Sequence, residues 1–444
     1  MSRTGPSRPD LRRPVRWGLQ HGVPKLAMAR AARQGDLQAQ LVVGQAARGE
    51  VPHQLFDQIR AAGPLQRSRH AFVTADHEAV RATLSSPDLR AGVDLANAPG
   101  LLGRMATWAA SGAPLGPLTT PSLLVTEPPD HTRMRKLVTR VFSVRAVQAL
   151  RVRTEQIADE LLDALAAASG RVDLVEAYCS LLPVTVIAEI LGVPTDERAT
   201  VRSFGNAAAP SLDLGLRWTQ FREVEATLSQ FDAWLTTHLE RKRRDPGSDL
   251  LSALVAARDD DGTALTDAEL RSTAGLVLAA GFETTVNLLG NGIALLHDHP
   301  DQLALLREDP ERWPNAVEEV LRLDPPVLLT GRTAVRDTDV LGVEVRRGSV
   351  VTALLAGANR DPKAFADPGT FDVTRPNAGD HVSFSNGRHY CLGAALARME
   401  GEVGLRHLFD RFPDLSLEPG ARRRDTRILR GWATLPATPG VASR

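Results

Sequence analysis

The sequence predicts a mainly α-helical protein with a small β-rich region, on the basis of three observations. Apolar residues recur at helical spacing through nearly all of residues 129–323. Short alternating patterns bounded by turn residues, which are typical of β-strands, occur around residues 64–75 and 327–356. A long apolar stretch, residues 273–296, predicts one long buried helix.

The remaining segments complete the predicted organisation. Residues 1–50 are basic and form an N-terminal extension, whose predicted helix within "PKLAMARAARQGDLQAQLVVG" we expect to pack on the rest of the protein. Residues 51–444 are expected to form one domain. Residues 91–126 are rich in Gly, Ala, Pro and Leu without clear periodicity, which indicates a functional loop or lid. An irregular loop, residues 376–391, precedes a last long helix predicted from Leu392.

Composition narrows the class of protein. Lys and Arg together number 53, and Asp and Glu also number 53, so the chain lacks the basic excess of a nucleic-acid-binding protein. Cys179 and Cys391 are the only cysteines, too few for a disulfide framework, which favours a reducing, cytoplasmic location. The first residues have no apolar core of a signal peptide, which agrees with this expectation.

The apolar stretch of residues 273–296 is also long enough to cross a bilayer. Glu283 would then lie near the bilayer centre at a cost of about 3 kcal/mol, and Asn287 and Asn291 would add to that cost. We therefore predict a helix buried in protein and no transmembrane segment. Its start is predicted by Thr266 and Glu269, which have the spacing of a capping box.

The lone cysteine in "FSNGRHYCLG", residues 384–393, is the most informative feature. Cys391 directly precedes the last predicted helix, and a helix N-terminus lowers the pKa of a thiol. The residues themselves allow a nucleophile, a zinc ligand, an iron ligand or a buried structural thiol. Zinc is disfavoured because the chain has no CxxC or HExxH pattern. A nucleophile is disfavoured because His389 is too near in sequence to activate the sulfur.

The residues around the cysteine fit the pattern F-x-x-G-x-[RH]-x-C-x-G at Phe384, Gly387, His389, Cys391 and Gly393. Here the sequence resembles the cytochrome P-450 family, the haem-thiolate monooxygenases. The resemblance implies that family's fold, in which a long central helix lies over a buried haem b. It also implies that Cys391 is the axial ligand of the haem iron, that Phe384 packs near the sulfur and that His389 reaches a haem carboxylate.

The motif "AGFETT", residues 280–285, lies within the predicted long helix. By itself it also fits a kinked helix whose threonine hydroxyls bond back to the helix carbonyls. The resemblance implies that Ala280 and Gly281 lie against the haem and leave room for O2. It further implies that Thr284 and Glu283 deliver protons to the oxygen.

An E-x-x-R motif occurs four times, beginning at Glu78, Glu240, Glu319 and Glu344, so the motif alone has little weight. Only the copy at Glu319 precedes the second β-rich region and the cysteine loop in the order of the family. The resemblance therefore implies that Glu319, Arg322 and Arg375 form a structural cluster that supports the cysteine loop.

The stretch "EPPDHTRMRKLV" places His131 and Arg135 one helical turn apart. The resemblance implies that both, together with Arg332, bind the two haem carboxylates. Three further cations on the same stretch are candidates for a surface that docks an acidic electron donor, although each is also typical of an ordinary solvated helix: Arg133, Lys136 and Arg140.

The resemblance implies an oxidoreductase that inserts one oxygen atom from O2 into a hydrophobic small molecule, such as a fatty acid, terpenoid, steroid or polyketide. No flavin or ferredoxin domain is found in the sequence, so we expect electrons from NAD(P)H through a separate ferredoxin reductase and ferredoxin. We expect a monomer. The expected substrate pocket includes Leu101, Leu102, Met105, Trp108, Val327, Leu328 and Leu329.

Three alternatives remain at this stage. A peroxide-driven haem peroxygenase would share the fold but would often lack the acid–threonine pair that this chain has. A haem sensor or carrier would bind a gas without turnover. A membrane protein could be built on residues 273–296.

Overall fold

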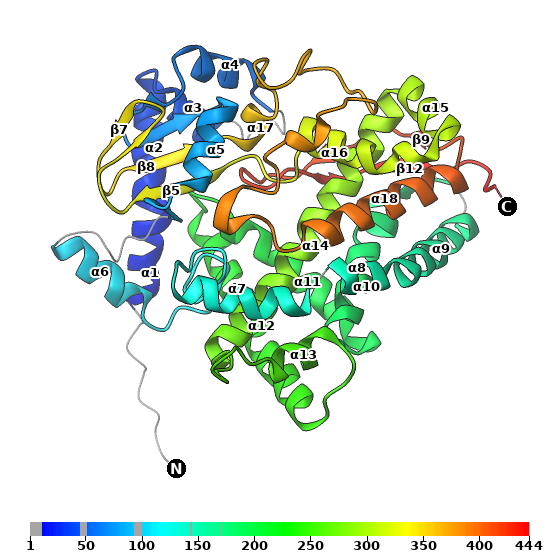
Figure 1. The fold of residues 1–444 in the computed structure, drawn as a ribbon, viewed down its shortest axis with the longest axis horizontal. Helices are drawn as coiled ribbons and strands as arrows, with labels where there is room; N and C mark the ends of the chain where they lie inside the picture. Colours follow the sequence, from blue (N-terminus) through cyan, green and yellow to red (C-terminus); the bar gives the residue numbers. More distant parts are fainter. Residues whose placement is uncertain (1–10, 45–50, 93–99, 143, 169, 444) are drawn as a thin grey trace.

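The computed structural model describes residues 11–44, 51–92, 100–142, 144–168 and 170–443. Helices make up most of this part of the chain, and the predicted fold class is confirmed (Figure 1). The helices are α1 (Arg12–Trp17), α2 (Val23–Arg33), α3 (Leu37–Gly44), α4 (His53–Ala61), α5 (His77–Ser85), α6 (Leu101–Ala110), α7 (Asp130–Val141), α8 (Val144–Ala149), α9 (Arg151–Ala167), α10 (Leu181–Ile190), α11 (Arg198–Ala208), α12 (Trp218–Arg244), α13 (Leu250–Ala256), α14 (Asp267–Asp298), α15 (Pro300–Glu308), α16 (Trp313–Leu323), α17 (Leu355–Ala358) and α18 (Ala394–Arg411).

The strands are short and form four small sheets. A five-stranded sheet has the order β1-β2-β8-β5-β3, a three-stranded sheet has the order β4-β12-β9, and β6-β7 and β10-β11 are two-stranded. The strands are β1 (Gln66–Arg67), β2 (Phe72–Thr74), β3 (Leu89–Ala91), β4 (Val172–Asp173), β5 (Thr330–Ala334), β6 (Thr338–Val340), β7 (Val343–Val345), β8 (Val350–Ala353), β9 (Ser416–Leu417), β10 (Arg422–Arg423), β11 (Trp432–Thr434) and β12 (Pro436–Thr438).

The two β-rich regions that the sequence predicts meet in the five-stranded sheet. β2 pairs in parallel with β8, and β5 pairs antiparallel with β8. The inward side chains of these strands, including Phe72, Ala334 and Val351, form one apolar cluster. β3 adds to the edge of this sheet beside β5 and lies outside the predicted strand regions.

The long helix α14 runs through the main hydrophobic core. Thr266 caps it as predicted: the Glu269 backbone N–H donates to the Thr266 hydroxyl (3.3 Å), and the Thr266 N–H donates to the Glu269 carboxylate (2.8 Å). α10, α11, α12, α16 and α18 pack against α14. Among the described residues, no helix is long and apolar enough to cross a membrane.

The described part of the N-terminal extension packs on the rest of the protein. Arg16 is buried and forms an ion pair with Glu225 of α12 (2.5 Å). Leu41 of α3 joins an apolar cluster with Phe56 of α4, and Gln38 donates to the Thr352 hydroxyl of β8 (2.7 Å). Residues 1–10 and 45–50 of the extension lie outside the described residues.

Strand β4 is a short exception within the helix-rich stretch of residues 129–323, and it pairs with β12 near the C-terminus. Two local predictions need correction. Residues 91–126, predicted to be a loop, contain helix α6; residues 93–99 lie outside the described part of this segment. The last long helix begins at Ala394 rather than Leu392.

Candidate functional site

The cysteine loop is held in a tight turn ahead of α18. The Cys391 N–H donates to the Phe384 carbonyl (2.8 Å), which closes the loop over a 3₁₀ turn at Gly387–His389. Gly387 has φ +66°, and a Cβ at this position would lie 2.9 Å from the Leu84 carbonyl oxygen of α5. Only glycine fits there without strain, so the glycine of the motif is explained by packing.

The backbone around the cysteine leaves one open side. Ser385 has φ +64°, a conformation that L residues rarely adopt. Phe384 is buried, and the Arg398 guanidinium lies over its ring at 4.5 Å. A Cβ at Gly393 would meet no other described atom within 4 Å, so the space beside this residue is open.

The thiol of Cys391 is solvent-reachable although protein atoms crowd around it, as expected for a group that lines an internal hollow. Burial raises its pKa above the usual value, against the opposing effects of the Gly393 N–H and the nearby Arg135 and Arg398. The predicted lowering of this pKa is therefore wrong for the protein alone. Helix α18 begins three residues later, and desolvation outweighs its positive end.

Two buried side chains near the cysteine loop, His131 and Arg332, each have a nitrogen atom without a hydrogen-bond partner among the described residues. His131 of α7 is buried and its Nε2 has no hydrogen-bond partner among the described residues. Burial lowers its pKa to about 4, so the ring is neutral near pH 7. Arg332 of β5 is buried, and its partners among the described residues are neutral oxygens, those of Thr330 (3.0 Å), Gly331 (2.9 Å) and Ser385 (3.4 Å).

The Arg332 Nε has no partner within the described part of the chain, and burial lowers the pKa of its guanidinium to about 10. A buried cation is costly unless an anion faces it. Arg135 lies on the same side, and its guanidinium donates to the Tyr390 carbonyl beside the cysteine (2.7 Å). The structure thus brings His131 and Arg135 of α7 and Arg332 of β5 to the cysteine loop, from two segments that are distant in the sequence.

Glu127 is a member of this cluster that sequence reasoning missed. Its carboxylate lies 3.2 Å from the His389 Nε2 and 3.3 Å from Arg388, and it accepts the Ala91 N–H at 2.7 Å. Burial acts to raise the pKa of Glu127, but the His389 hydrogen bond and the Ala91 N–H hold it below its ordinary value. Its position directly before the Pro-Pro start of α7 was the available signal.

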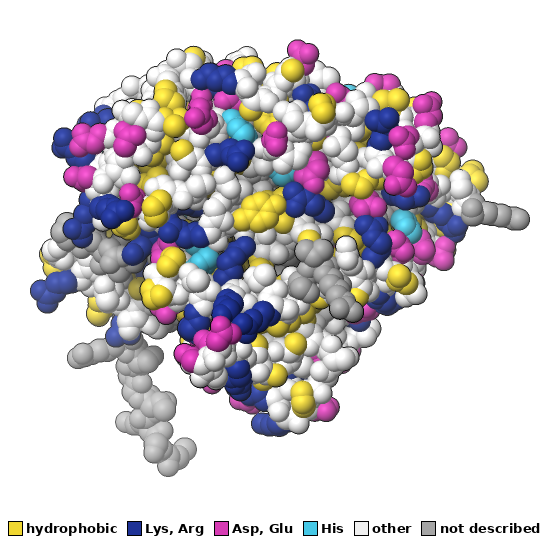
Figure 2. Space-filling view, in the orientation of Figure 1, with side chains coloured by type: hydrophobic (Ala, Val, Ile, Leu, Met, Phe, Trp, Pro, Cys, Tyr) yellow, Lys and Arg dark blue, Asp and Glu magenta, His cyan; other side chains and the backbone are white. Residues whose placement is uncertain are grey.

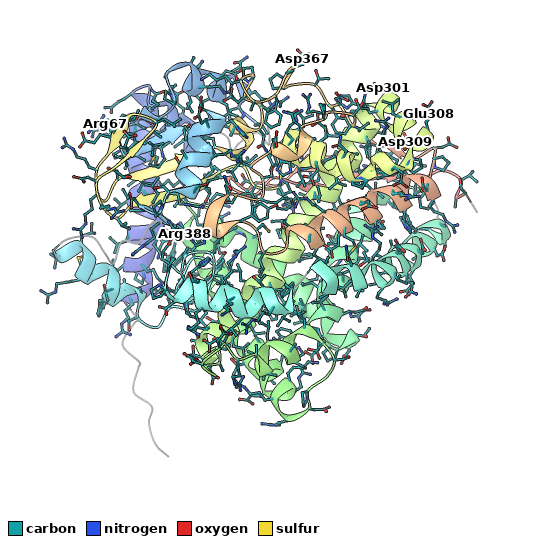
Figure 3. The ribbon with its side chains drawn as sticks, viewed as in Figure 1. Arg67, Asp301, Glu308, Asp309, Asp367 and Arg388 are labelled. Carbon is teal, nitrogen blue, oxygen red and sulfur yellow. The ribbon has the colours of Figure 1, made fainter. Side chains whose placement is uncertain are left out.

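His389 therefore faces a protein carboxylate, and its ring lies 4.6 Å from that of His131. Arg388, labelled in Figure 3, extends from the loop toward the C-terminal end of α5, where it donates to the Ser86 carbonyl (2.6 Å). The loop is thus attached on both sides by charged residues.

The side of α14 that carries "AGFETT" is open at one point. Ala280 is exposed and Gly281 and Thr284 are half-buried, although most of the following residues of this helix are buried. The Thr284 hydroxyl donates to the Ala280 carbonyl (2.7 Å), and the Thr285 hydroxyl donates to the Gly281 carbonyl (2.9 Å). The back-bonded threonines of the simpler interpretation are present, and the Thr284 oxygen keeps its acceptor capacity.

Glu283 lies on an adjacent side of the same helix turn and is buried. The Arg424 Nη1 is 2.6 Å from its Oε1, an ion pair whose angles fall outside those of a directed hydrogen bond. Burial raises the pKa of Glu283 to about 7, and Arg424 opposes this effect. The carboxyl is therefore poised to gain and lose a proton near neutral pH.

Glu400 is a second buried acid that the sequence analysis did not identify. It lies on α18, where burial raises its pKa to about 8 and an interaction with the Thr285 hydroxyl opposes the rise. Its Oε1 has no partner within the described chain. A glutamate inside an otherwise apolar helix face, nine residues after the cysteine, was the available signal.

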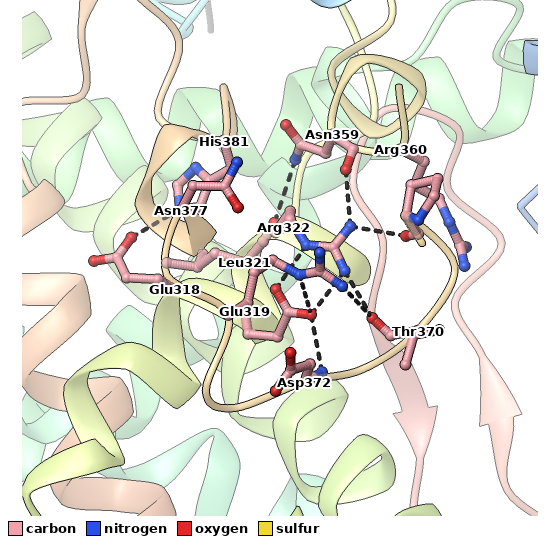
Figure 4. Close-up of polar contacts among 12 residues, drawn as sticks. Glu318, Glu319, Leu321, Arg322, Asn359, Arg360, Thr370, Asp372, Asn377 and His381 are labelled. Carbon is pink, nitrogen blue, oxygen red and sulfur yellow. Dashed lines mark hydrogen bonds and ion pairs between the residues drawn. The ribbon is translucent and has the colours of Figure 1, made fainter. Parts of the chain in front are cut away.

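The predicted cluster of Glu319, Arg322 and Arg375 is present and buried (Figure 4). Glu319 accepts from Arg322 at 2.6 and 2.7 Å and from Arg375 at 3.1 Å. Arg322 also donates to the carbonyls of Asn359, Pro368 and Thr370, at 2.9, 2.8 and 3.0 Å.

The cluster is connected to the cysteine loop through Asn359. The Asn359 side chain accepts the Val382 N–H (2.8 Å) and donates to the Ser383 hydroxyl (2.8 Å). Val382 and Ser383 directly precede Phe384. A continuous set of hydrogen bonds therefore runs from α16 to the start of the loop that carries Cys391.

The apolar residues predicted for a substrate pocket are not gathered at one place. Four of them, on α6, are exposed, because this helix lies at the edge of the molecule and buries little beyond Gly103 and Ala109: Leu101, Leu102, Met105 and Trp108 (Figure 1). Leu328 belongs to a core cluster with Phe56 of α4. Val327 and Leu329 are half-buried.

The cations proposed for an electron-donor surface are paired within the chain. Arg133 contacts Glu269, and both Lys136 and Arg140 contact Asp260 (2.7 Å for Arg140). Figure 2 shows this mixture of cationic and acidic side chains below the centre of the visible face. Their net positive charge is therefore smaller than the sequence suggested.

Haem is a flat group with two carboxylates, and the site fits such a group. The unpartnered Nε2 of His131 and the unpartnered Nε of Arg332 can serve the carboxylates. The open space at Gly393 and the exposed Ala280 can receive the flat ring. Among the described residues, no group of three or more His, Cys, Asp or Glu could hold a metal ion. The fold and the site thus define a protein built around a flat anionic cofactor beside a single thiol.

Comparison with known proteins agrees with this class. The family model "Cytochrome P450" matches residues 210–439. "Putative cytochrome P450 140" of Mycobacterium tuberculosis (strain ATCC 25618 / H37Rv) is 53% identical over 430 residues, which cover 96% of this chain and 98% of that protein. The 6-deoxyerythronolide B hydroxylase of Saccharopolyspora erythraea is 46% identical over 70% of this chain and 76% of its own. The chain belongs to the cytochrome P450 family, and it is a monooxygenase of the oxidoreductase class.

Solved structures show the same fold. The ligand-free P450 monooxygenase TamI is similar with a TM-score of 0.74 and 37% identity, over 88% of this chain and 92% of that one. CYP105P1 in complex with filipin I is similar with a TM-score of 0.76 and 35% identity, over 87% and 95% of the two chains.

Proposed function

We propose that this protein inserts one oxygen atom from O2 into a large hydrophobic molecule of polyketide or steroid size. The observation that carries the proposal is the pair of buried, unpartnered nitrogens at His131 and Arg332 beside the solvent-reachable Cys391. Together with the open turn of α14 at Ala280, they outline a site for thiolate-bound haem in the protein interior. Cys391 would hold the haem through its thiolate, and a haem held in this way would supply the activation of O2.

Each residue has a proposed part in holding the cofactor. Cys391 binds the iron through its thiolate, and metal binding offsets the desolvation that raises the pKa of the free thiol. His131, Arg135 and Arg332 would bind the haem carboxylates. His389 contacts Glu127 and would also contact one haem carboxylate. Phe384, Gly387 and Gly393 shape the loop, whose position is supported by Glu319, Arg322 and Arg375.

Proton delivery is proposed to use Thr284 and Glu283. The Thr284 hydroxyl donates to Ala280, so its oxygen can accept and orient a water molecule in the open turn. Glu283 can supply protons near neutral pH because its pKa is about 7. This acid–threonine pair favours O2-driven turnover over the peroxide-driven alternative.

The proposed substrate class is based on the activities for which two relatives are named. One relative hydroxylates 6-deoxyerythronolide B, and another, 41% identical over 73% of this chain, is a vitamin D(3) 25-hydroxylase of Pseudonocardia autotrophica. Fatty acids and terpenoids of smaller size are the remaining candidates. Electrons are proposed to come from NAD(P)H through a separate reductase and ferredoxin, and the protein is proposed to act as a monomer.

A carbon-monoxide difference spectrum of the reduced protein tests the ligand. We expect the red-shifted Soret band of a thiolate-bound haem in the wild type and its loss in Cys391→Ser. An unchanged spectrum in that variant would reject the assignment of the ligand.

Turnover then separates the remaining alternatives. Macrolide aglycones and sterols should shift the iron spin state, and a surrogate ferredoxin system should give a hydroxylated product with NAD(P)H oxidation. Product formed from peroxide alone would indicate a peroxygenase, and gas binding without NAD(P)H oxidation would indicate a sensor or carrier.

A further inference from the structure

Exposed apolar side chains are concentrated on one part of this molecule. Sixteen large hydrophobic residues are exposed among those the structure describes, and half of them lie on the helical run α1–α2, on α6 and at one turn before α12. We call these eight residues the N-terminal apolar surface: Leu11, Val23, Leu26, Leu101, Leu102, Met105, Trp108 and Leu214.

The start of the helical run contacts both α6 and the turn before α12, so the three segments lie in one region of the molecule. The Arg16 guanidinium of α1 donates to the Ala109 carbonyl of α6, and Arg12 lies over the Trp108 ring at 5.9 Å. The Trp17 indole N–H donates to the Leu216 carbonyl (2.9 Å). α6 lies at the left edge of the view in Figure 1, and α1 lies beside it.

The charge of two of these segments is one-sided, although the whole chain is balanced and the turn before α12 contains Asp213 as well as Arg217. Residues 11–35 contain six Lys and Arg and no Asp or Glu, and residues 95–126 contain Arg104 and no acidic residue. Arg13 and Arg16 are paired with Glu225, at 2.6 and 2.5 Å. Within the described residues, no carboxylate forms an ion pair with three exposed cations of α2: Lys25, Arg30 and Arg33.

Apolar and cationic side chains also share one side of α2. Val23, Leu26, Arg30 and Arg33 follow one another at i, i+3, i+7 and i+10, so they lie along one helix face, and all four are exposed. Exposed apolar side chains beside unbalanced cations are the features by which a helix lies in the interface of an anionic bilayer.

We propose that the N-terminal apolar surface binds reversibly to the surface of an anionic lipid bilayer, without crossing it. Apolar side chains of α2 and α6 enter the boundary between headgroups and acyl chains, and Arg30 and Arg33 contact lipid phosphates. The proposal uses none of the residues assigned to the haem site and does not depend on the proposed substrate.

Co-sedimentation of the full-length, haem-loaded protein with vesicles tests the proposal. Vesicles of phosphatidylcholine with about 30% phosphatidylglycerol are compared with vesicles of phosphatidylcholine alone. We expect at least tenfold stronger binding to the anionic vesicles, and loss of most of this binding at about 0.5 M salt because the Debye length shortens.

The chain offers a matched pair of variants. Val23 and Val152 are 63% and 64% exposed, and α9, which carries Val152, lies on the right of Figure 1, away from α1 and α6. Val23→Glu should weaken vesicle binding about tenfold, whereas Val152→Glu should leave it unchanged. The carbon-monoxide spectrum of both variants checks that they are folded.

Three outcomes would overturn the proposal. They are equal binding to both vesicle types, equal loss of binding in the two variants, and a dimer that Val23→Glu dissociates in the absence of lipid. The last result would identify the surface as a contact between two copies of this chain.

Discussion

Replacement of Glu319 by Ala should destabilise the fold strongly, because this carboxylate is the shared partner of two buried cations. It accepts from Arg322 at 2.6 and 2.7 Å, from Arg375 at 3.1 Å and from the Asp372 N–H at 3.0 Å. Arg322 is fully buried and Arg375 nearly so. After the substitution, carbonyl oxygens remain as acceptors for both guanidiniums, but no carboxylate balances either charge.

The magnitude follows from the burial. Removal of one partner of a buried ion pair costs about 3–5 kcal/mol, and here one substitution leaves two cations unbalanced. We expect a loss of about 5 kcal/mol, which is a large part of the roughly 5–15 kcal/mol by which proteins are stable. With an unfolding entropy of about 2 cal/mol/K per residue, the melting temperature of this chain should fall by about 5 °C.

Urea unfolding followed by far-ultraviolet circular dichroism measures the effect. Glu344→Ala is the matched control, because Glu344 begins another E-x-x-R copy but contacts Arg346 at 3.4 Å on the surface. It should change the urea midpoint by no measurable amount. If Glu319→Ala does not fold, Glu319→Gln should show a smaller loss of the same sign. Equal midpoints for Glu319→Ala and Glu344→Ala would refute the reasoning.

Three further predictions concern single residues. Ser385→Gly should stabilise the fold by about 0.5–1 kcal/mol in urea unfolding, because Ser385 has φ +64°; destabilisation would mean that its 3.4 Å contact with Arg332 matters more. Glu400→Gln should raise the free energy of unfolding by about 3 kcal/mol at pH 7, with little change at pH 4. In the folded protein Glu400 has a pKa of about 8 and keeps its proton, whereas in the unfolded chain it releases the proton near pH 4.5. The stability of the wild type therefore falls as the pH rises between these two values, and that of the Gln variant does not. Parallel pH profiles of stability for the two proteins would contradict this prediction. Arg424→Met should raise the pKa of Glu283 above about 7, because Arg424 stabilises the charged carboxylate. The amount of product formed per NAD(P)H, which should decrease at alkaline pH as Glu283 loses its proton, should then decrease at a pH about one unit or more higher. An unchanged pH profile would show that Glu283 does not deliver protons.

Features that depend on neighbouring residues could be predicted from the sequence. The capping box of Thr266 and Glu269 and the pairing of Glu319 with Arg322 each need only helix geometry over three residues. The cysteine loop was recognisable because its turn needs a glycine at Gly387, and the packing on Leu84 gives the physical reason.

The sequence by itself determined the helical class, the long buried helix and, through the motif around Cys391, the family of the chain. These features depend on local spacing and composition. Only the tertiary structure decided that Glu127 meets His389, that Arg424 meets Glu283 and that β4 pairs with β12. It also decided the direction of the pKa shift of the Cys391 thiol, which burial raises despite the nearby helix N-terminus. Such contacts join segments more than a hundred residues apart or depend on how much water the whole fold excludes, and neither quantity is written in a local pattern of residues.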